Sequence, residues 1–267
     1  MTFHRMLLLF ARIFSRYGPV FFLSRFRVKF RSPKHGINNA SPYEPIGRGG
    51  TLETIGQNYR PSKRNHDYLR HYETHLGQIR TTVRNVLEIG VQTDSSLLMW
   101  EEFFPNATIW GIDIDPECAE FSGGRRQVRI GNQSDEDFLR AVAAEVLDHG
   151  GVDVVIDDGS HRVNHQLISF EVLFPLMNSH GIYVVEDTGG VVGDRSNLVM
   201  RSLVDLTSGI FSWPKNVEPK NWPYVTKLDS DSSWWDQNVT GIAVYRWLVF
   251  VMRGRNPEDN HYLSRRG

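Results

Sequence analysis

The sequence has little of what would mark a secreted, nucleic-acid-binding or dinucleotide-binding protein. Cys118 is the one cysteine among 267 residues, so no disulfide can form within the chain, and we expect a cytoplasmic protein. The formal net charge is -1 and the catalytic region has no basic stripe, which argues against a nucleic-acid partner. The first expected strand ends in Gly90 without the further glycines of G-x-G-x-x-G, which argues against a nicotinamide or flavin cofactor.

Long apolar runs are also missing from the N-terminal segment. The stretch from Met6 to Phe14 is interrupted by Arg12 and is too short for a transmembrane helix, which needs about 20 apolar residues. No signal-peptide cleavage site follows it. All charged side chains within residues 5–31 are basic, so two interpretations stay open. The segment is either a cationic amphipathic surface on the inner face of a membrane, or a helical arm that packs against the body or against a second subunit of a homo-oligomer.

Beyond a linker that ends near residue 50, strand-like and helix-like stretches alternate. The apolar patterns predict helices over residues 51–59, 67–76, 95–104, 135–148 and 165–177, and strands over residues 85–90, 108–113, 152–157 and 181–187. This alternation predicts an α/β domain with parallel strands over residues 51–267, after an arm and linker over residues 1–50. Ligands bind such sheets at the carboxyl ends of the strands, so we expect the chemistry after residues 90, 113, 157 and 187.

The ends of the first two expected strands indicate a nucleotide-like ligand. Gly90 lets the backbone approach a ligand at a turn that leads into a helix. Asp113, at the end of the second strand, is placed to accept both hydroxyls of a ribose. Candidates for the adenine end of the site are Asn132, Gln133 and Ser134. For this last group, capping of the following helix by Ser134 or Asp135 is an equally open interpretation.

Two pairs of adjacent acids follow the later strands, Asp157 with Asp158 and Glu186 with Asp187. No lysine or arginine is directly beside either pair in sequence, so the carboxylates would repel one another unless a cation lay between them. Carboxylate oxygens suit Mg²⁺ better than Zn²⁺. His161, three residues after Asp158, can reach a hydroxyl at that metal and act as a general base. The alternative is that these acids only cap two helices.

Together these residues resemble the metal-dependent sugar O-methyltransferases of the macrolide-tailoring type, which are class I S-adenosylmethionine (SAM)-dependent enzymes. The likeness runs from about residue 51 to 254. Its pieces are Leu52 to Lys63 with His66, Tyr72 to His75, Leu87 to Val91, Ser96 to Trp100 with Phe103 to Pro105, Gly111 to Pro116, Ile156 to His161, Glu186 to Thr188, and Leu248 to Val251 before Arg253 and Gly254. Their order and spacing make the match specific.

The resemblance implies a Rossmann-like class I methyltransferase fold, with a mostly parallel seven-stranded sheet and helices on both faces. It implies that Asp158, Glu186 and Asp187 hold Mg²⁺ and that His161 is the catalytic base. The SAM-binding residues it suggests, together with those above, are Glu88, Gly90, Asp113, Asn132, Gln133, Ser134 and Asp157, with Tyr59 and Lys63 from a segment that closes over the cofactor. One departure is Asp94, which stands where the family often has glycine.

The function expected from these patterns is Mg²⁺-dependent transfer of the SAM methyl group to a hydroxyl of a sugar, in a glycoside, glycolipid or polysaccharide. Residues 189–240 are interpreted as a substrate lid, whose aromatic side chains either stack on a sugar or pack the lid. These aromatic residues are Trp213, Trp222, Tyr224, Trp234 and Trp235. Two alternatives stay open: a metal-dependent O-methyltransferase of a catechol or other phenol, and a non-catalytic SAM-binding protein.

Overall fold

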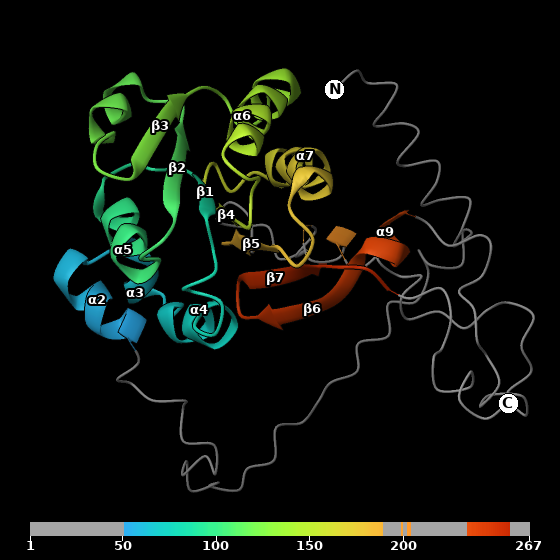
Figure 1. Ribbon diagram of the computed structural model, residues 1–267, viewed down its shortest axis with the longest axis horizontal. Helices are drawn as coiled ribbons and strands as arrows, with labels where there is room; N and C mark the ends of the chain where they lie inside the picture. The colour runs from blue at the N-terminus through green and yellow to red at the C-terminus, as the bar shows by residue number, and fades with distance from the viewer. Residues whose placement is uncertain (1–50, 189–198, 200–201, 204–233, 257–267) are drawn as a thin grey trace, which may run out of the picture. The chain divides into compact units, whose positions relative to one another are not determined.

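The computed structural model describes residues 51–188, 199, 202–203 and 234–256 (Figure 1). The expected N-terminal arm and linker over residues 1–50 lie outside these residues, as does most of the expected lid, including Trp213, Trp222 and Tyr224. Within the described part of the chain, no helix is both long enough and apolar enough to cross a membrane.

A seven-stranded sheet forms the centre of the domain, in the order β3-β2-β1-β4-β5-β7-β6. The strands are β1 (Asn85–Ile89), β2 (Thr108–Asp113), β3 (Arg126–Ile130), β4 (Val154–Asp157), β5 (Ile182–Glu186), β6 (Val239–Tyr245) and β7 (Leu248–Arg253). The first five are parallel, whereas β7 is antiparallel to β5 and to β6. The strand order reverses between β1 and β4, and ligands bind open α/β sheets at such a switch point.

Helices cover both faces of the sheet (Figure 1). They are α2 (Thr51–Tyr59), α3 (Ser62–Asn65), α4 (Leu69–Leu76), α5 (Ser95–Phe103), α6 (Glu136–Asp148), α7 (Val163–Leu173) and α9 (Trp234–Asn238). Helices α2, α4 and α5 belong to one buried apolar cluster, and α6 and α7 to the other. Because both faces are covered, every residue of β1 and β5 is buried, which explains why these strands are mostly apolar; their polar residues are Asn85, Glu88 and Glu186.

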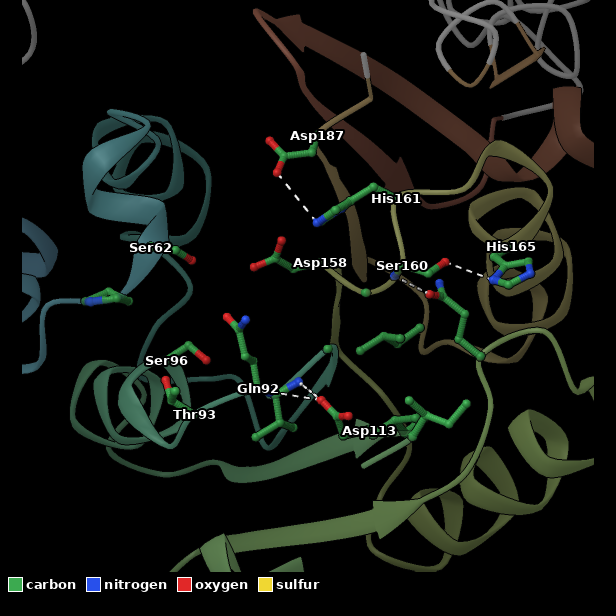
Figure 2. A pocket seen from close by; sticks show the side chains of 18 of the residues that line it. Ser62, Gln92, Thr93, Ser96, Asp113, Asp158, Ser160, His161, His165 and Asp187 are labelled. Atoms are coloured by element: carbon green, nitrogen blue, oxygen red, sulfur yellow. Dashed lines mark hydrogen bonds and ion pairs between the residues drawn. The ribbon is translucent and has the colours of Figure 1, made fainter. Parts of the chain in front are cut away.

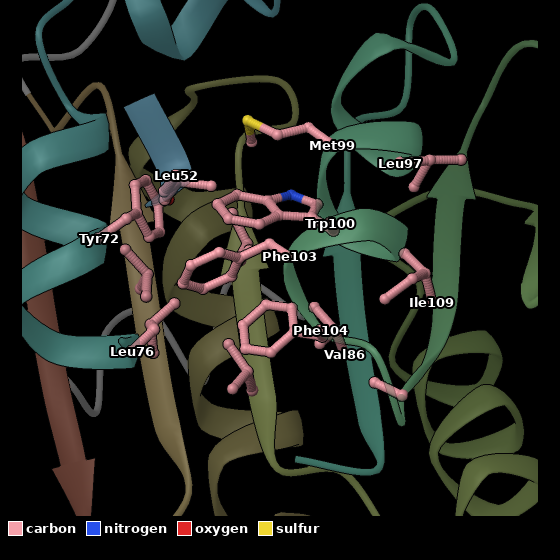
Figure 3. Packing of buried hydrophobic residues seen from close by; sticks show 14 of the residues in the cluster. Leu52, Tyr72, Leu76, Val86, Leu97, Met99, Trp100, Phe103, Phe104 and Ile109 are labelled. Carbon is pink, nitrogen blue, oxygen red and sulfur yellow. The ribbon is translucent and has the colours of Figure 1, made fainter. Parts of the chain in front are cut away.

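The first apolar cluster fixes the helices that precede the sheet (Figure 3). Trp100 of α5 is fully buried, and the ring of Tyr72 from α4 packs edge-on against it with 5.0 Å between centroids. Leu52 of α2 and Phe103 of α5 are also fully buried in this cluster. Burial of each such side chain stabilises the fold by roughly 1.5–3 kcal/mol. This packing holds α2 to α4 close to the carboxyl ends of the strands.

The predicted elements agree with the structure except near their ends and at the sheet edges. The helix expected over residues 165–177 begins at Val163 and ends at Leu173, followed by a short 3-10 helix, Phe174–Leu176. The change of helix type coincides with Pro175, which has no backbone N–H to donate. Strands β3 and β6 were not predicted individually because edge strands are half exposed and carry polar residues.

Candidate active site

A cavity of about 590 Å³ opens at the carboxyl ends of β1, β2, β4 and β5 (Figure 2). It is lined by residues 60–62, 66, 89–93, 95–96, 112–114, 131–133, 158–162, 165 and 187. Among the predicted site residues, the lining includes Gly90, Asp113, Asn132, Gln133, Asp158, His161 and Asp187. It does not include Tyr59, Lys63, Glu88, Ser134, Asp157 or Glu186, whose side chains have other partners described below.

The turn after β1 can only be made by glycine. Gly90 has a φ of +90°, and its N–H donates to the carbonyl of Ile112 on β2 at 2.8 Å. A Cβ at this position would lie 2.2 Å from the carbonyl oxygen of Asp158. The missing side chain therefore lets the β1 turn and the β4 turn meet at the floor of the cavity.

Asp113 ties the end of β2 to this turn. Its Oδ2 accepts hydrogen bonds from the backbone N–H groups of Val91 at 2.8 Å and Gln92 at 2.9 Å, and its Oδ1 accepts from Asp115 N–H at 2.9 Å. Figure 2 shows the carboxylate at the cavity edge beside Gln92. Each carboxylate oxygen has two acceptor positions, so Oδ2 is fully used and Oδ1 retains one position for a ribose hydroxyl.

The predicted adenine-side residues are used mostly within the protein. Gln133 donates from Nε2 to Asp157 at 3.0 Å and accepts the Ser160 N–H at 2.7 Å. Ser134 contacts Asn132 Oδ1 rather than the cavity. The cap of α6 is Asp135, which accepts the N–H groups of residues 137 and 138, so capping is confirmed for Asp135. Asn132 and Gln133 still contribute to the cavity wall.

Asp157 lies beneath the cavity, on the buried side of β4. Besides the Gln133 amide it has the Tyr183 hydroxyl as a donor, 3.4 Å from Oδ2. Burial raises the pKa of Asp157 to about 6, although the hydrogen bond from Gln133 opposes this shift. In this structure Asp157 therefore supports the cavity floor and does not reach the cavity.

Asp158, His161 and Asp187 meet at the opposite end of the cavity from Asp113 (Figure 2). One ligand atom from each lies within 4.8 Å of the others, and His161 Nε2 is 3.7 Å from Asp187 Oδ2. His161 Nδ1 is buried and has no hydrogen-bond partner among the described residues. The two carboxylates can hold a divalent cation, with the imidazole of His161 beside it.

The backbone at this end of the cavity is strained. Arg60, Gln92, His161 and Asp187 all line the cavity, and their φ values are +54°, +51°, +54° and +52°. Side chains other than glycine rarely adopt this left-handed conformation, which costs about 1–3 kcal/mol per residue. Such strain persists where the surrounding structure enforces it, and it gathers at functional sites.

The α3–α4 segment supplies hydrogen-bond donors to Glu186 and Asp187, the two acids at the end of β5. Tyr68 donates its hydroxyl to Asp187 Oδ1 at 2.7 Å, and Tyr72 donates to Glu186 Oε1 at 2.5 Å. Burial, and then the neighbouring Asp158, raise the pKa of Glu186 above its ordinary value, and Lys63 opposes this shift. The Glu186 carboxylate is directed to this buried side, and its predicted metal-ligand role stays a prediction.

Lys63 is the central residue of the buried side. Its Nζ lies 2.5 Å from Asp158 Oδ2, 2.9 Å from Glu186 Oε1 and 3.0 Å from Glu88 Oε1, and its side chain is 1% exposed. Burial alone would lower the pKa of Lys63, but the three carboxylates outweigh it and raise the pKa well above its usual range. The cation that sequence reasoning required between the acids is therefore partly supplied by a lysine far away in sequence.

The remaining predicted positions lie around the cavity. Glu88 is fully buried, and its carboxylate accepts from Ser96 Oγ at 2.7 Å and Trp100 Nε1 at 3.2 Å. Tyr59 donates its hydroxyl to Glu102 at 2.8 Å on the surface. Asp94 precedes α5 and does not belong to the cavity lining, although Thr93 and Ser95 on either side of it do.

Sequence reasoning missed the roles of Tyr68 and of the Ser160–His165 pair. Tyr68 falls within the helix expected over residues 67–76, and its four-residue spacing from Tyr72 places both hydroxyls on one face, toward the acids. Ser160 Oγ lies 2.8 Å from His165 Nδ1, and burial lowers the pKa of His165. Both residues line the cavity.

The two described tryptophans of the expected lid pack against α7. The Trp235 ring stacks on Phe170 at 5.3 Å, and Trp234 meets Phe174 edge-on at 6.3 Å. Trp234 remains 40% exposed. The structure thus gives Trp235 the packing role that was one of the two interpretations of the lid aromatics.

The sheet order, the glycine turn at the switch point and the acids at the strand ends define a Rossmann-like class I methyltransferase domain. The MycE methyltransferase of the mycinamycin pathway, solved in complex with Mg, SAH and mycinamycin VI, has this fold. It superposes with a TM-score of 0.65 at 30% identity, over 79% of this chain and 55% of that chain. The predicted fold class is confirmed.

The curated relatives of the chain are sugar-tailoring O-methyltransferases, which confirms the predicted resemblance. The mycinamicin VI 2''-O-methyltransferase of Micromonospora griseorubida is 33% identical over 211 residues, 72% of this chain and 49% of the relative. A tetracenomycin rhamnosyl 3'-O-methyltransferase of Streptomyces olivaceus is 32% identical over 207 residues, 70% of this chain and 49% of the relative. The chain spans about half the length of these relatives. No protein-family model matches it.

Proposed function

We propose that the chain catalyses Mg²⁺-dependent transfer of the SAM methyl group to a sugar hydroxyl on a glycosylated small molecule. The observation that carries the proposal is the arrangement of Asp158, His161 and Asp187 within 4.8 Å at one end of a cavity whose other end has the Gly90 turn and Asp113. The named activities of the curated relatives support the sugar as acceptor.

The cavity fits a nucleoside-bearing methyl donor. Its volume of about 590 Å³ lies within the range of small-molecule sites. Asp113 offers an acceptor position for a ribose hydroxyl at the end of β2, and Gly90 lets a ligand approach the backbone at the end of β1. Asn132 and Gln133 form the wall on the expected adenine side.

The acid end fits a hard divalent cation. Asp158 and Asp187 each contribute carboxylate oxygen, and the group stands open to the cavity on the side away from Lys63. Lys63 already neutralises one of the negative charges of Glu88, Asp158 and Glu186, so the remaining carboxylate charge is what a divalent cation would balance. Glu186 is a further candidate ligand from the same strand end.

The protein's own groups then position the reactants and move the proton. A bound methyl donor would supply an electrophilic methyl group on sulfur, and Mg²⁺ would supply positive charge that lowers the pKa of an adjacent hydroxyl. His161 Nε2, on the Asp187 side of the ring, accepts the hydroxyl proton while the sugar oxygen forms its bond to the methyl carbon and the methyl–sulfur bond breaks. Asp187 stabilises the imidazolium that results.

A methyl-transfer assay with labelled SAM tests this proposal. The acceptors are a panel of glycosides and catechols, and each is assayed in Mg²⁺ and in EDTA. We expect label only in glycosides, loss of transfer in EDTA, and recovery when Mg²⁺ is restored. Transfer to catechols instead would favour the phenolic alternative. SAM binding that is insensitive to metal, with no transfer to any acceptor, would favour a non-catalytic SAM-binding protein.

A further inference from the structure

The acid cluster contains two cation positions that share one carboxylate. The first is occupied by Lys63 Nζ, which contacts Glu88, Asp158 and Glu186. The second is open and is formed by Asp158 and Asp187, with His161 beside them. Asp158 belongs to both positions, so a charge placed at one is felt directly at the other.

Lys63 suits the first position because it has as many N–H donors as there are carboxylates, and because its charge is opposite to theirs. An ammonium group has three N–H donors, and Lys63 has three carboxylate partners at 2.5–3.0 Å from three different strand ends, β1, β4 and β5. Glu88 and Glu186 are almost completely buried, so water cannot replace the ammonium as their partner. The neutral donors Ser96, Trp100 and Tyr72 bind the same carboxylates but bring no positive charge.

We propose that Lys63 is a built-in counter-ion and a positioning residue of the site: it holds Asp158 and Glu186 in place when no divalent cation is bound. Without this charge, three carboxylates at the ends of neighbouring strands would repel one another in a poorly solvated environment. Lys63 also anchors α3, at whose start Arg60, Pro61 and Ser62 line the cavity. Figure 2 shows Ser62 on the side of the cavity that faces Asp158. The same ammonium thus connects this side of the cavity to the acids.

The role of Lys63 in the cation-free protein follows from its buried contacts alone. Occupation of the open position by a divalent cation rests on the proposed function. Stability in EDTA tests the role of Lys63, and Mn²⁺ binding to the unmodified chain, followed by electron paramagnetic resonance, tests the proposed function separately.

The deciding experiment compares Lys63→Met, Lys63→Arg and Arg64→Met by thermal unfolding in EDTA. Methionine keeps the length and apolar stem of lysine but not its charge, and Arg64 is a matched control because its contact with Glu53 at 3.5 Å is on the surface. Loss of a buried ion partner of this kind is expected to lower the unfolding midpoint of Lys63→Met by about 10 °C. Lys63→Arg should recover part of the loss, and Arg64→Met should change the midpoint by less than about 2 °C.

A second variant keeps the proposal testable if Lys63→Met does not fold. Lys63→Met/Glu88→Gln removes one carboxylate together with the cation, and we expect it to fold better than Lys63→Met alone. If Lys63→Met is as stable as the unmodified chain in EDTA, or if the Glu88→Gln change gives no recovery, Lys63 is a packing residue and the proposal is wrong.

Discussion

Tyr68 donates its hydroxyl to Asp187 Oδ1 at 2.7 Å, and this bond joins α4's N-cap to the residue that follows β5. It leaves Asp187 Oδ2 directed toward His161. Orientation of a carboxylate by such a partner commonly contributes about 10–100-fold to metal affinity or activity. The hydroxyl of Tyr68 therefore sets which oxygen of Asp187 faces the open cation position.

Tyr68→Phe should weaken Mn²⁺ binding by about 10-fold while SAM affinity changes little. The reason is that Asp187 loses its fixed orientation although no cofactor-lining residue is altered. Titration calorimetry with each ligand measures both effects. Tyr59→Phe is the matched control because the Tyr59 hydroxyl binds Glu102 on the surface, and equal losses in the two variants would contradict the assignment.

His161→Ala should lower the turnover number for methyl transfer by about 10²–10⁴-fold, the usual contribution of a general base. SAM affinity should remain within about twofold, because Asp113 and the Gly90 turn are unchanged. His149→Ala provides the control, since His149 lies against Trp110 outside the cavity. Retained turnover in His161→Ala would show that another group takes the proton.

Asp113→Asn should weaken SAM binding by roughly 10–100-fold, the effect of losing hydrogen bonds to a charged acceptor. The variant also weakens the contacts with the backbone of residues 91 and 92, so the turn after β1 loosens. Calorimetry in EDTA measures SAM binding in the absence of metal. Asp115→Asn, at the cap of the 3-10 helix Pro116–Phe121, should bind SAM as the unmodified chain does.

Gly90→Ala should abolish measurable SAM binding and lower the thermal midpoint. A methyl group there meets the Asp158 carbonyl at 2.2 Å, in a backbone conformation that alanine disfavours. Gly241→Ala serves as the comparison because its added Cβ would meet nothing nearer than Met252 Sδ at 3.7 Å. SAM binding in Gly90→Ala equal to that of Gly241→Ala would mean that the turn does not contact the cofactor.

The stability of the unmodified chain should depend on pH through Asp157. Burial raises its pKa to about 6 from an unfolded value near 3.8, so the protonated form is favoured in the folded state. The stability that this proton contributes is fully present below about pH 4 and is lost as the pH rises through about 6. Asp157→Asn should thus gain in unfolding midpoint relative to the unmodified chain between pH 4.5 and 8 in EDTA. If the difference in unfolding midpoint between Asp157→Asn and the unmodified chain does not change with pH, Asp157 ionises normally.

Much of the fold was predictable because β1, β4 and β5 are buried along their whole length, and β2 over its central residues, so that these strands are mostly apolar. The strand-end rule likewise located Gly90, Asp113, Asp158 and His161 at one cavity, since parallel strands deliver their carboxyl ends to the same edge. Boundaries differed by a few residues where caps and Pro175 decided them.

The function of Lys63 was not predictable from local sequence. The rule that searches strand ends considers only residues that follow β-strands, whereas Lys63 and Tyr68 precede β1 and reach the acids through the packing of α4 on Trp100. Similarly, the sequence alone left the amide of Gln133 available to bind a ligand, but in the structure it forms hydrogen bonds with Asp157 and Ser160. The roles of Lys63, Tyr68 and Gln133 are therefore determined by tertiary contacts.

The hydrogen bonds from Lys63, Tyr72 and Tyr68 to Asp158, Glu186 and Asp187 join residues 95, 114 and 119 positions apart. Contacts so distant in sequence form late, because the intervening chain must first be ordered. During synthesis the lysine and the tyrosines leave the ribosome well before the acids that they bind. The complete site can therefore assemble only after β5 has been made, and chains interrupted before that strand lack Glu186 and Asp187, the partners of Tyr72 and Tyr68.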